Sequence, residues 1–409
     1  MQLPLIAPPP PPPHSPTPLQ PIGTQGDIRY YDAVAKGVLN SPETTGMGFW
    51  SINPYVGCAF GCAYCYARYA HRYVAERAAT VAPDATELVE LPPWLAFERR
   101  IFVKRNAVEV LRETLQTGWR SKVRGQMAEG GGAASRLTTH GSRLARGPRS
   151  ASRLTRLWAG ETVVIGTATD PYQPAERSYR VTRGILEVLA EERGLSVVII
   201  TKSALITRDL DVLCRLANRS SLTVHLSLIT LDRELARRIE PRAPTPEARV
   251  RAVERMAAAG LDVGINIMPV LPGITDRPAM LDGVVRRVAA AGASHINACA
   301  LRLRVTARRR YLPFIEAEFP ALAGAYRTAY SAGHQMGDAY REGLRRFLRA
   351  RCRKHGISYG TPEVRGSASD GSARVGSAWA ATEPDDEMDA VRPGHAPTAP
   401  AQLALFRES

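Results

Sequence analysis

The 409-residue sequence lacks any apolar run approaching the roughly 18 to 20 residues that a membrane-spanning helix needs, so we expect no membrane span. Its first twenty residues contain no lysine or arginine, and Pro8 to Pro13 are six consecutive prolines, which excludes a secretory signal there. Cysteine is scarce, with six in all. In a long chain without such a signal, thiols stay reduced. The sequence therefore predicts a cytoplasmic protein without structural disulfides.

Acidic residues are also outnumbered: 39 Asp and Glu stand against 54 Lys and Arg, a net charge of +15. An excess of this size favours polyanionic partners such as DNA, because binding releases the counterions of the phosphates. A GC-rich genome, which encodes much arginine and alanine, would give the same composition without such a partner. The charge is concentrated at 118–158, where nine basic residues accompany the single acid Glu129.

Two basic segments could contact phosphates. Flexible arginines in 118–158 could follow a nucleic-acid backbone without reading bases, although a loop expansion with no partner has the same composition. Arg302, Arg304 and 308–310 form a second cluster, which could instead pair with acidic residues at 316 and 318 on a solvated helical face.

Composition divides the chain into segments of different texture. We expect a Pro-rich disordered lead (1–27), a core barrel (28–117 and 159–305), a basic Gly/Ser/Arg insertion loop (118–158), a C-terminal helical extension (306–360) and a disordered tail (361–409).

Within the core, short β-branched runs alternate with helical periodicity. The predicted strands are 50–55, 162–167, 196–201, 222–229, 262–269 and 294–301, and the predicted helices are 181–192, 208–218, 246–259 and 278–291. Such alternation implies right-handed crossovers and a parallel sheet. The predicted fold is therefore α/β, a partial (β/α)6 TIM-like barrel with disordered tails and a basic insertion. Its functional residues should lie at the carboxyl ends of the strands.

Three cysteines follow the first predicted strand with the spacing Cys58-x3-Cys62-x2-Cys65, and Tyr64 precedes the last of them. Three thiolates on one tight loop can hold three corners of a [4Fe–4S] cluster and leave one iron without a protein ligand. The amino and carboxylate groups of S-adenosylmethionine can chelate that iron. One electron from the cluster then cleaves the sulfonium and yields a 5′-deoxyadenosyl radical.

A zinc site remains an alternative for this loop. It would use the three cysteines with His71 as the fourth ligand, in a nucleic-acid-binding protein without catalysis. The usual zinc spacings pair cysteines differently, and His71 falls in what resembles the following helix.

The cysteine motif resembles that of the radical S-adenosylmethionine superfamily. The string Gly-Thr-Ala-Thr-Asp-Pro-Tyr-Gln-Pro-Ala-Glu at 166–176 is similar to its spore photoproduct lyase-like branch, often labelled DNA repair photolyase-related. Phe-Val-Lys-Arg-Asn-Ala at 102–107 and Ile-Ile-Thr-Lys-Ser at 199–203 resemble the same branch. The resemblance covers roughly 52–303 without the insertion. It implies a radical enzyme with a [4Fe–4S] cluster, S-adenosylmethionine and an electron donor such as flavodoxin or ferredoxin.

Beyond the cysteines, the cofactor-binding residues expected from the resemblance are Tyr64, Thr169, Asp170, Glu176, Lys202, Ser227 and Asn266. It implies that Lys202 and Ser227 bind the carboxylate and amino end of the cofactor, and that Tyr64 lies near the adenine. Ordinary roles stay open: Asp170 could cap a helix, Lys202 could be a solvated strand-end lysine, and Ser227 a core hydroxyl.

One departure limits the analogy. Spore photoproduct lyase uses a hydrogen-donating cysteine downstream of the cluster, whereas this sequence has no cysteine between Cys65 and Cys214. Cys299, on the sixth predicted strand, could donate hydrogen or could be a buried structural thiol. Cys214 and Cys352 fall in predicted helices.

The last residues resemble the peptide that binds the bacterial sliding clamp. Leu403, Leu405 and Phe406 would enter an apolar pocket, and Gln402 would set the register. The resulting hypothesis is a cytoplasmic radical enzyme that acts on DNA in a repair-related, lyase-like reaction. The alternatives are radical chemistry on RNA, a peptide or a small metabolite, or the zinc-stabilised protein above.

Overall fold

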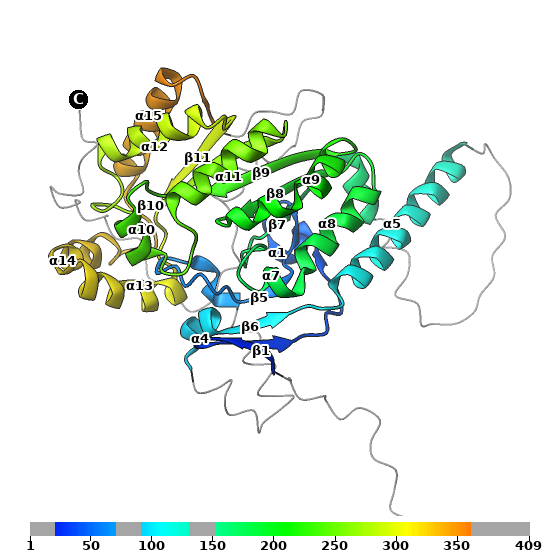
Figure 1. Ribbon diagram of the computed structural model, residues 1–409, viewed down its shortest axis with the longest axis horizontal. Helices are drawn as coiled ribbons and strands as arrows, with labels where there is room; N and C mark the ends of the chain where they lie inside the picture. The colour runs from blue at the N-terminus through cyan, green and yellow to red at the C-terminus, as the bar shows by residue number, and fades with distance from the viewer. Residues whose placement is uncertain (1–20, 71–90, 131–152, 361–409) are drawn as a thin grey trace, which may run out of the picture.

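The computed structural model describes residues 21–70, 91–130 and 153–360. Its centre is a sheet with the strand order β12–β11–β10–β9–β8–β7–β4–β3 (Figure 1). The parallel strands between the edges are β4 (Trp50–Ile52), β7 (Thr162–Ile165), β8 (Ser196–Thr201), β9 (Ser221–Ser227), β10 (Asp262–Val270) and β11 (His295–Ala300). β3 (Leu39–Asn40) is antiparallel at one edge, and β12 (Ser358–Tyr359) is parallel at the other.

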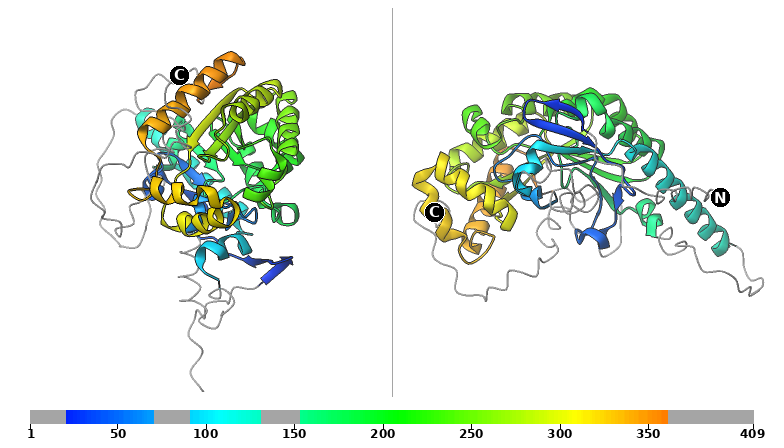
Figure 2. Two further views of the ribbon diagram at one scale, coloured as in Figure 1. Left: turned by 90° about the vertical axis from the view of Figure 1, so that its left-hand side faces the viewer. Right: turned by 90° about the horizontal axis from the view of Figure 1, so that it is seen from below.

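Helices connect successive strands and cover the outer face of the sheet (Figures 1 and 2). The main ones are α8 (Val181–Glu191), α9 (Leu210–Ala217), α11 (Pro246–Ala258) and α12 (Pro278–Ala290). Local sequence explains their bounds: at α11 the Thr245 side chain caps the helix by accepting from Ala248 N, and proline takes the first helical position. The predicted strands and helices are confirmed to within a few residues at their ends, except that the predicted strand 50–55 is divided between β4 and a separate strand of a second sheet. The fold is α/β of the partial (β/α)6 TIM-like type.

Short elements fill the connections. They are α1 (Pro42–Thr45), the 3-10 helices η1 (Tyr66–Tyr69), η2 (Thr155–Ala159) and η3 (Ala204–Asp209), α7 (Glu176–Tyr179) and α10 (Arg233–Ile239). Among the described residues no helix is both long and apolar enough to cross a membrane.

A second sheet, β1–β2–β6–β5, lies beside the start of the cysteine loop. It consists of β1 (Pro21–Gln25), β2 (Ile28–Asp32), β6 (Arg100–Val103) and β5 (Tyr55–Val56), with α4 (Pro93–Arg99) leading into β6. This corrects the expected lead of 1–27, because β1 pairs with β2 in a tight hairpin that turns at Gly26, where φ is 60°. Residues 1–20 are outside the described part.

The expected insertion at 118–158 is corrected at both ends. Helix α5 (Ala107–Gly130) continues through its first third, and Leu154 and Leu157 of the segment that ends in η2 are buried in the core. The Trp119 and Trp158 rings meet edge to face at 5.8 Å, so aromatic packing joins the two ends. What remains of the insertion, 131–152, is outside the described residues.

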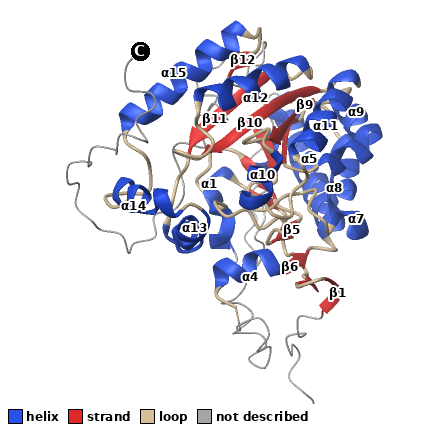
Figure 3. Cartoon of the chain, turned by 60° about the vertical axis from the view of Figure 1, so that its left-hand side comes forward, coloured by secondary structure: helices blue, strands red, loops and turns tan. Residues whose placement is uncertain are grey.

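The C-terminal helices α13 (Val305–Glu318), α14 (Pro320–Ala329) and α15 (Asp338–Lys354) close one end of the barrel, and Figure 3 shows α12 and α15 beside β11 and β12. Buried tyrosines join them to the strand-end loops. Tyr326 donates to Pro272 O (2.7 Å), Tyr330 to Leu301 O (3.0 Å) and Tyr340 to Asp276 (2.9 Å). The tail 361–409, with the expected clamp-binding residues Gln402, Leu403, Leu405 and Phe406, is not among the described residues.

A histidine pair lies inside the barrel below the strand ends. His225 on β9 and His295 on β11 approach at 2.9 Å between their Nε2 atoms, across Gly264 of the intervening β10. A Cβ on Gly264 would lie 2.2 Å from His295 Nε2 and 2.8 Å from His225 Cδ2. Only glycine at this position leaves room for both imidazoles.

Gly264→Ala is expected to lower the free energy of unfolding by about 1–3 kcal/mol, because the added methyl must displace buried rings in a packed interior. The matched control is Gly324→Ala on exposed α14, where nothing lies within 4 Å of the new Cβ. There the change should stabilise by about 0.5–1 kcal/mol through helix propensity. Urea unfolding of both variants measures the difference, and equal effects would contradict the packing argument.

The histidine pair also predicts an acid sensitivity. Burial, with His295 as the second cause, lowers the pKa of His225 to about 3, and burial lowers the pKa of His295. Below about pH 6.5 the unfolded chain takes up protons that the folded pair refuses. Stability from this source should therefore be complete above pH 6.5 and decline as pH falls toward 3. Between pH 7 and 4.5, the urea midpoint of the double variant His225→Gln/His295→Gln should fall less steeply than that of wild type. Parallel plots of midpoint against pH for the two proteins would refute this prediction.

Candidate active site

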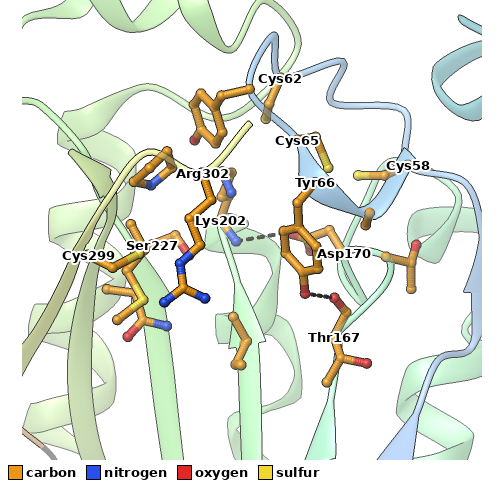
Figure 4. A pocket seen from close by; sticks show the side chains of 18 of the residues that line it. Cys58, Cys62, Cys65, Tyr66, Thr167, Asp170, Lys202, Ser227, Cys299 and Arg302 are labelled. Carbon is orange, nitrogen blue, oxygen red and sulfur yellow. Dashed lines mark hydrogen bonds between the residues drawn. The ribbon is translucent and has the colours of Figure 1, made fainter. Parts of the chain in front are cut away.

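A cavity of about 220 Å³ lies at the carboxyl ends of the parallel strands, between them and the cysteine loop 57–65 (Figure 4). The sequence-predicted residues that line it are Cys58, Cys62, Cys65, Tyr64, Thr169, Asp170, Lys202, Ser227, Asn266 and Cys299. Functional side chains from segments far apart in the sequence therefore line one cavity, as expected for a barrel of this type.

The cysteine loop needs glycine at two positions. Gly57 has φ 87°, and a Cβ there would lie 2.7 Å from Phe97 O. Gly61 has φ 66°, and its Cβ would meet the Arg242 guanidinium at 2.6 Å. These left-handed turns let the backbone pass close to its neighbours while the three thiols line the pocket.

The loop after β7 holds the cysteine loop from one side. Thr169 Oγ1 and Gln173 Nε2 both donate to Gly57 O, at 2.6 and 3.0 Å, and Gln173 Oε1 accepts from Ala59 N at 2.9 Å. Sequence reasoning assigned Thr169 to the cofactor and missed Gln173. The polar string at 166–176 was the available signal, but it did not distinguish residues that hold the loop from residues that face the pocket.

A buried ion pair holds the cysteine loop from the other side. Glu240 accepts a hydrogen bond from Tyr64 Oη and pairs with Arg249. Arg249 also donates to Ser227 O at 3.1 Å, and Ala63 N donates to Ile239 O at 3.0 Å. Neither charged residue was found from sequence, where the only signal was a proline-rich charged loop at 240–246 between a helix and α11.

A second buried pair supports the middle of the loop. Arg68 donates to Glu98 at 2.6 Å and to Cys62 O at 2.8 Å, and both side chains are almost wholly buried. Separating such a pair would leave an uncompensated buried charge, so Arg68 is held in one position. Its hydrogen bond to Cys62 O therefore fixes the loop backbone at that residue.

The thiols are free in this arrangement. Burial raises the pKa of the Cys58 thiol well above its usual range and that of Cys62 to about 12, with neighbouring negative charge adding to the shift at Cys58. Cys58 and Cys62 are therefore neutral thiols until a bound cation displaces their protons.

The donor set can be tested against the two metal groups considered. Among the described residues, no three His, Cys, Asp or Glu side chains converge on a point that could hold one ion. Three sulfur donors that line one pocket without converging fit an iron–sulfur cluster, in which each thiolate binds a different iron. His71, the fourth ligand of the zinc alternative, lies outside the described residues.

Lys202 places a cation beside the cysteine loop. Its Nζ lies 5.6 Å from the centroid of the Tyr64 ring. Burial alone would lower the pKa of Lys202, but the neighbouring acidic groups of Cys62, Glu240 and Asp170 together outweigh it, so the pKa is raised and the ammonium persists.

Asp170 orients the strand end that carries Lys202. Its carboxylate accepts from Thr201 Oγ1 at 2.6 Å and from the backbone N of Lys202 and Tyr172 at 2.7 and 2.9 Å. Burial raises its pKa in spite of these hydrogen bonds. Ser227 and Asn266 are neighbours in register on β9 and β10 and complete this side of the pocket.

The structure does not bring Glu176 to the pocket, which corrects its assignment to the cofactor. It is fully buried in α7, where it accepts from Tyr55 Oη, from Thr182 N at 2.9 Å and from Arg208 at 3.0 Å. Its carboxylate instead joins β5, the start of α8 and η3 through these hydrogen bonds.

Comparisons with known proteins identify the family of the chain. Residues 149–282 match the Radical SAM superfamily. An uncharacterized protein of Mycobacterium tuberculosis is 32% identical over 320 residues, 78% of each chain. The chain belongs to the radical SAM superfamily. Another relative, an uncharacterized protein of Methanocaldococcus jannaschii, is 23% identical over 59% of this chain and 68% of its own. Spore photoproduct lyase with bound dinucleoside spore photoproduct superposes with a TM-score of 0.49 at 14% identity, covering 81% of each chain.

Radical SAM enzymes use a [4Fe–4S] cluster and S-adenosylmethionine, so this chain is an iron–sulfur enzyme with those two cofactors. Its membership decides against the non-catalytic zinc protein. The cysteine loop precedes residues 149–282, which match the family. Residues of the loop and of the matched range line the same pocket.

The Glu240–Arg249 pair predicts a measurable asymmetry. Arg249→Met should cost about 3–5 kcal/mol because it strands a buried carboxylate, whereas adding Glu240→Leu should recover much of that loss. The exposed pair Arg345–Glu342 is the control, and Arg345→Met should cost less than about 1 kcal/mol. Urea unfolding measures the free energy of unfolding of all three variants. A double variant that is no more stable than Arg249→Met would rule out the coupling.

Proposed function

We propose that Cys58, Cys62 and Cys65 ligate the [4Fe–4S] cluster and that S-adenosylmethionine occupies the adjoining pocket. The observation that carries this is the joint placement of three free thiols and the Lys202 ammonium on one cavity at the strand ends. When bound, the cluster supplies the electron that cleaves the cofactor and so generates the species that abstracts hydrogen from substrate.

The chain's own residues hold the cofactor in this proposal. The Lys202 ammonium pairs with its carboxylate, and the Ser227 hydroxyl and Asn266 amide bind its amino end. Tyr64 is fixed by its hydrogen bond to Glu240 and presents its ring beside Lys202, where it lines the cavity. Thr169 and Asp170 line the cavity as part of the cofactor site and also position the cysteine loop and the Lys202 strand end.

The proposed substrate is DNA, in a repair-related, lyase-like reaction. The net charge of +15 supports a polyanionic substrate. A cytoplasmic flavodoxin or ferredoxin would supply the electron. The clamp-binding peptide at 402–406 would recruit the enzyme to replicating DNA, and the basic residues of 131–152 would add phosphate contacts.

The cysteine assignment predicts a sharp result on anaerobic reconstitution with iron and sulfide. Wild type should bind about four irons and, once reduced, form 5′-deoxyadenosine from S-adenosylmethionine. Cys58→Ala, Cys62→Ala or Cys65→Ala should each lose the cluster absorbance and all of this product. Cys214→Ala is the matched control, because that thiol lies on α9 outside the pocket, and it should behave as wild type.

The substrate is tested with the same holoenzyme. Ultraviolet-irradiated and untreated DNA, RNA and a peptide mixture are added separately, and 5′-deoxyadenosine yield and substrate mass are followed. A gain with irradiated DNA and a change in its mass support the proposal. Turnover with RNA or peptide alone would transfer the chemistry to that class.

A further inference from the structure

One wall of the pocket takes no part in the contacts described so far. It is formed by the segment that follows β11 and the segment that precedes α15, which pair through Leu303 N to His334 O at 2.8 Å and a bridge between Arg302 and Gln335. The pocket-lining side chains on it are Arg302, Arg304, His334 and Gln335. We call these four residues the arginine wall.

The arginine wall is held in place by an alternating strand-like segment. Leu301 and Leu303 are 1% exposed, whereas Arg302 and Arg304 are partly exposed and line the cavity. Leu301 N donates to Val270 O at 3.0 Å, and Tyr330 donates to Leu301 O at 3.0 Å. Because alternate residues of an extended segment point to opposite sides, this anchoring sends both guanidinium groups toward the pocket.

The arginine wall brings two guanidinium groups to the lining of the pocket. Figure 4 shows the Arg302 side chain extending into the cavity between Ser227 and Tyr66. Gln335 Nε2 donates to His334 Nε2 at 2.9 Å, which joins these two side chains beside the guanidinium groups. Guanidinium groups bind phosphate oxygens in well-defined, often bidentate geometry.

The cavity lining also includes apolar and aromatic side chains. These are Met47, Phe49, Phe60, Tyr66 and Tyr69. The Tyr66 and Tyr69 ring centroids are 6.4 Å apart, and Tyr66 donates to Thr167 O, which fixes its ring at the cavity edge. A pocket that combines stacking surface with guanidinium groups matches a nucleotide, which has a planar base joined to a charged phosphate.

We propose that Arg302 and Arg304, supported by His334 and Gln335, bind a backbone phosphate of the DNA substrate while the adjoining base lies against the aromatic side chains of the pocket. This inference rests on the proposed function and names the contact by which that site would take its substrate. The short Tyr66-bearing helix η1 directly follows the cysteine loop, so a base held there lies close to the cluster ligands.

The test uses the reconstituted holoenzyme and small probes, which avoid binding to other basic surfaces. Calorimetry compares thymidylyl-thymidine, its uncharged methylphosphonate analogue and thymidine monophosphate. Wild type should bind the charged dinucleotide about 10- to 100-fold more tightly than the neutral analogue, as expected for hydrogen bonds to a charged group. Thymidine monophosphate should bind more weakly than the dinucleotide, because it offers one base and no internucleotide phosphate.

Arg302→Gln and Arg304→Gln should each weaken the dinucleotide by about 5- to 20-fold and reduce the preference for the charged probe. S-adenosylmethionine affinity, iron content and the urea midpoint should stay at wild-type values. Arg345→Gln on the exposed face of α15 removes an equal charge and should leave all probes unaffected.

Several results would overturn the proposal. Equal binding of charged and neutral dinucleotides would show that no phosphate contact exists, as would a failure to bind either. Equal loss of S-adenosylmethionine affinity in Arg302→Gln would assign the arginine to the cofactor carboxylate. Thymidine monophosphate binding as tightly as the dinucleotide would indicate a free nucleotide in place of DNA.

Substrate-free 5′-deoxyadenosine formation separates this inference from the proposed function. If wild type forms that product but shows no phosphate preference, the arginine wall is wrong and the radical chemistry stands. If it forms none while bound to S-adenosylmethionine, the proposed function fails whatever the probes show.

Discussion

The cysteine loop 57–65 cannot hold its own shape, and the rest of the site depends on how its backbone carbonyls and amides are satisfied from outside. Two of its glycines adopt left-handed conformations, and its polar groups are met by Gln173, Glu98 with Arg68, and the Glu240–Arg249 pair through Tyr64. Each partner comes from a different part of the fold. The thiols are thus placed by the assembled barrel, and a loop of the same sequence in isolation would not place them.

This dependence explains why buried charge is concentrated where it is. Burying an ion pair carries a large desolvation cost, so such pairs are weak contributors to net stability but strong determinants of one geometry. Here two pairs flank one loop, and Arg249 also reaches the carbonyl of Ser227 at the end of β9. A single set of contacts therefore sets the position of the cysteine loop relative to the strand ends across the cavity.

The sequence predicted those parts of the molecule that are determined by interactions between residues close together in the chain. β8 was expected at 196–201 and begins and ends there, because a β-branched run bounded by polar residues needs no distant partner to be recognised. Cysteine spacing marked the metal loop for the same reason. Glu240 escaped notice because its partner Tyr64 is 176 positions away, a distance over which periodicity carries no information. Glu176 was misplaced for the converse reason: its motif was recognised, but which way one helical turn directs a side chain depends on packing.

The order of the strands in the sheet determines which functional residues lie next to one another in the pocket. Along the sheet the sequence runs β4, β7, β8, β9, β10, β11, with the cysteine loop after the first and Arg302 and Arg304 after the last. These are opposite ends of the parallel series, yet both line the same cavity. Lys202 and Ser227, on the middle strands, lie between them. On the proposed assignments the cofactor is held by the middle strands, the cluster by one end of the series and the substrate phosphate by the other. A substitution at the end of β11 should then alter substrate binding without disturbing the cysteine loop, since no described contact of that loop comes from β11.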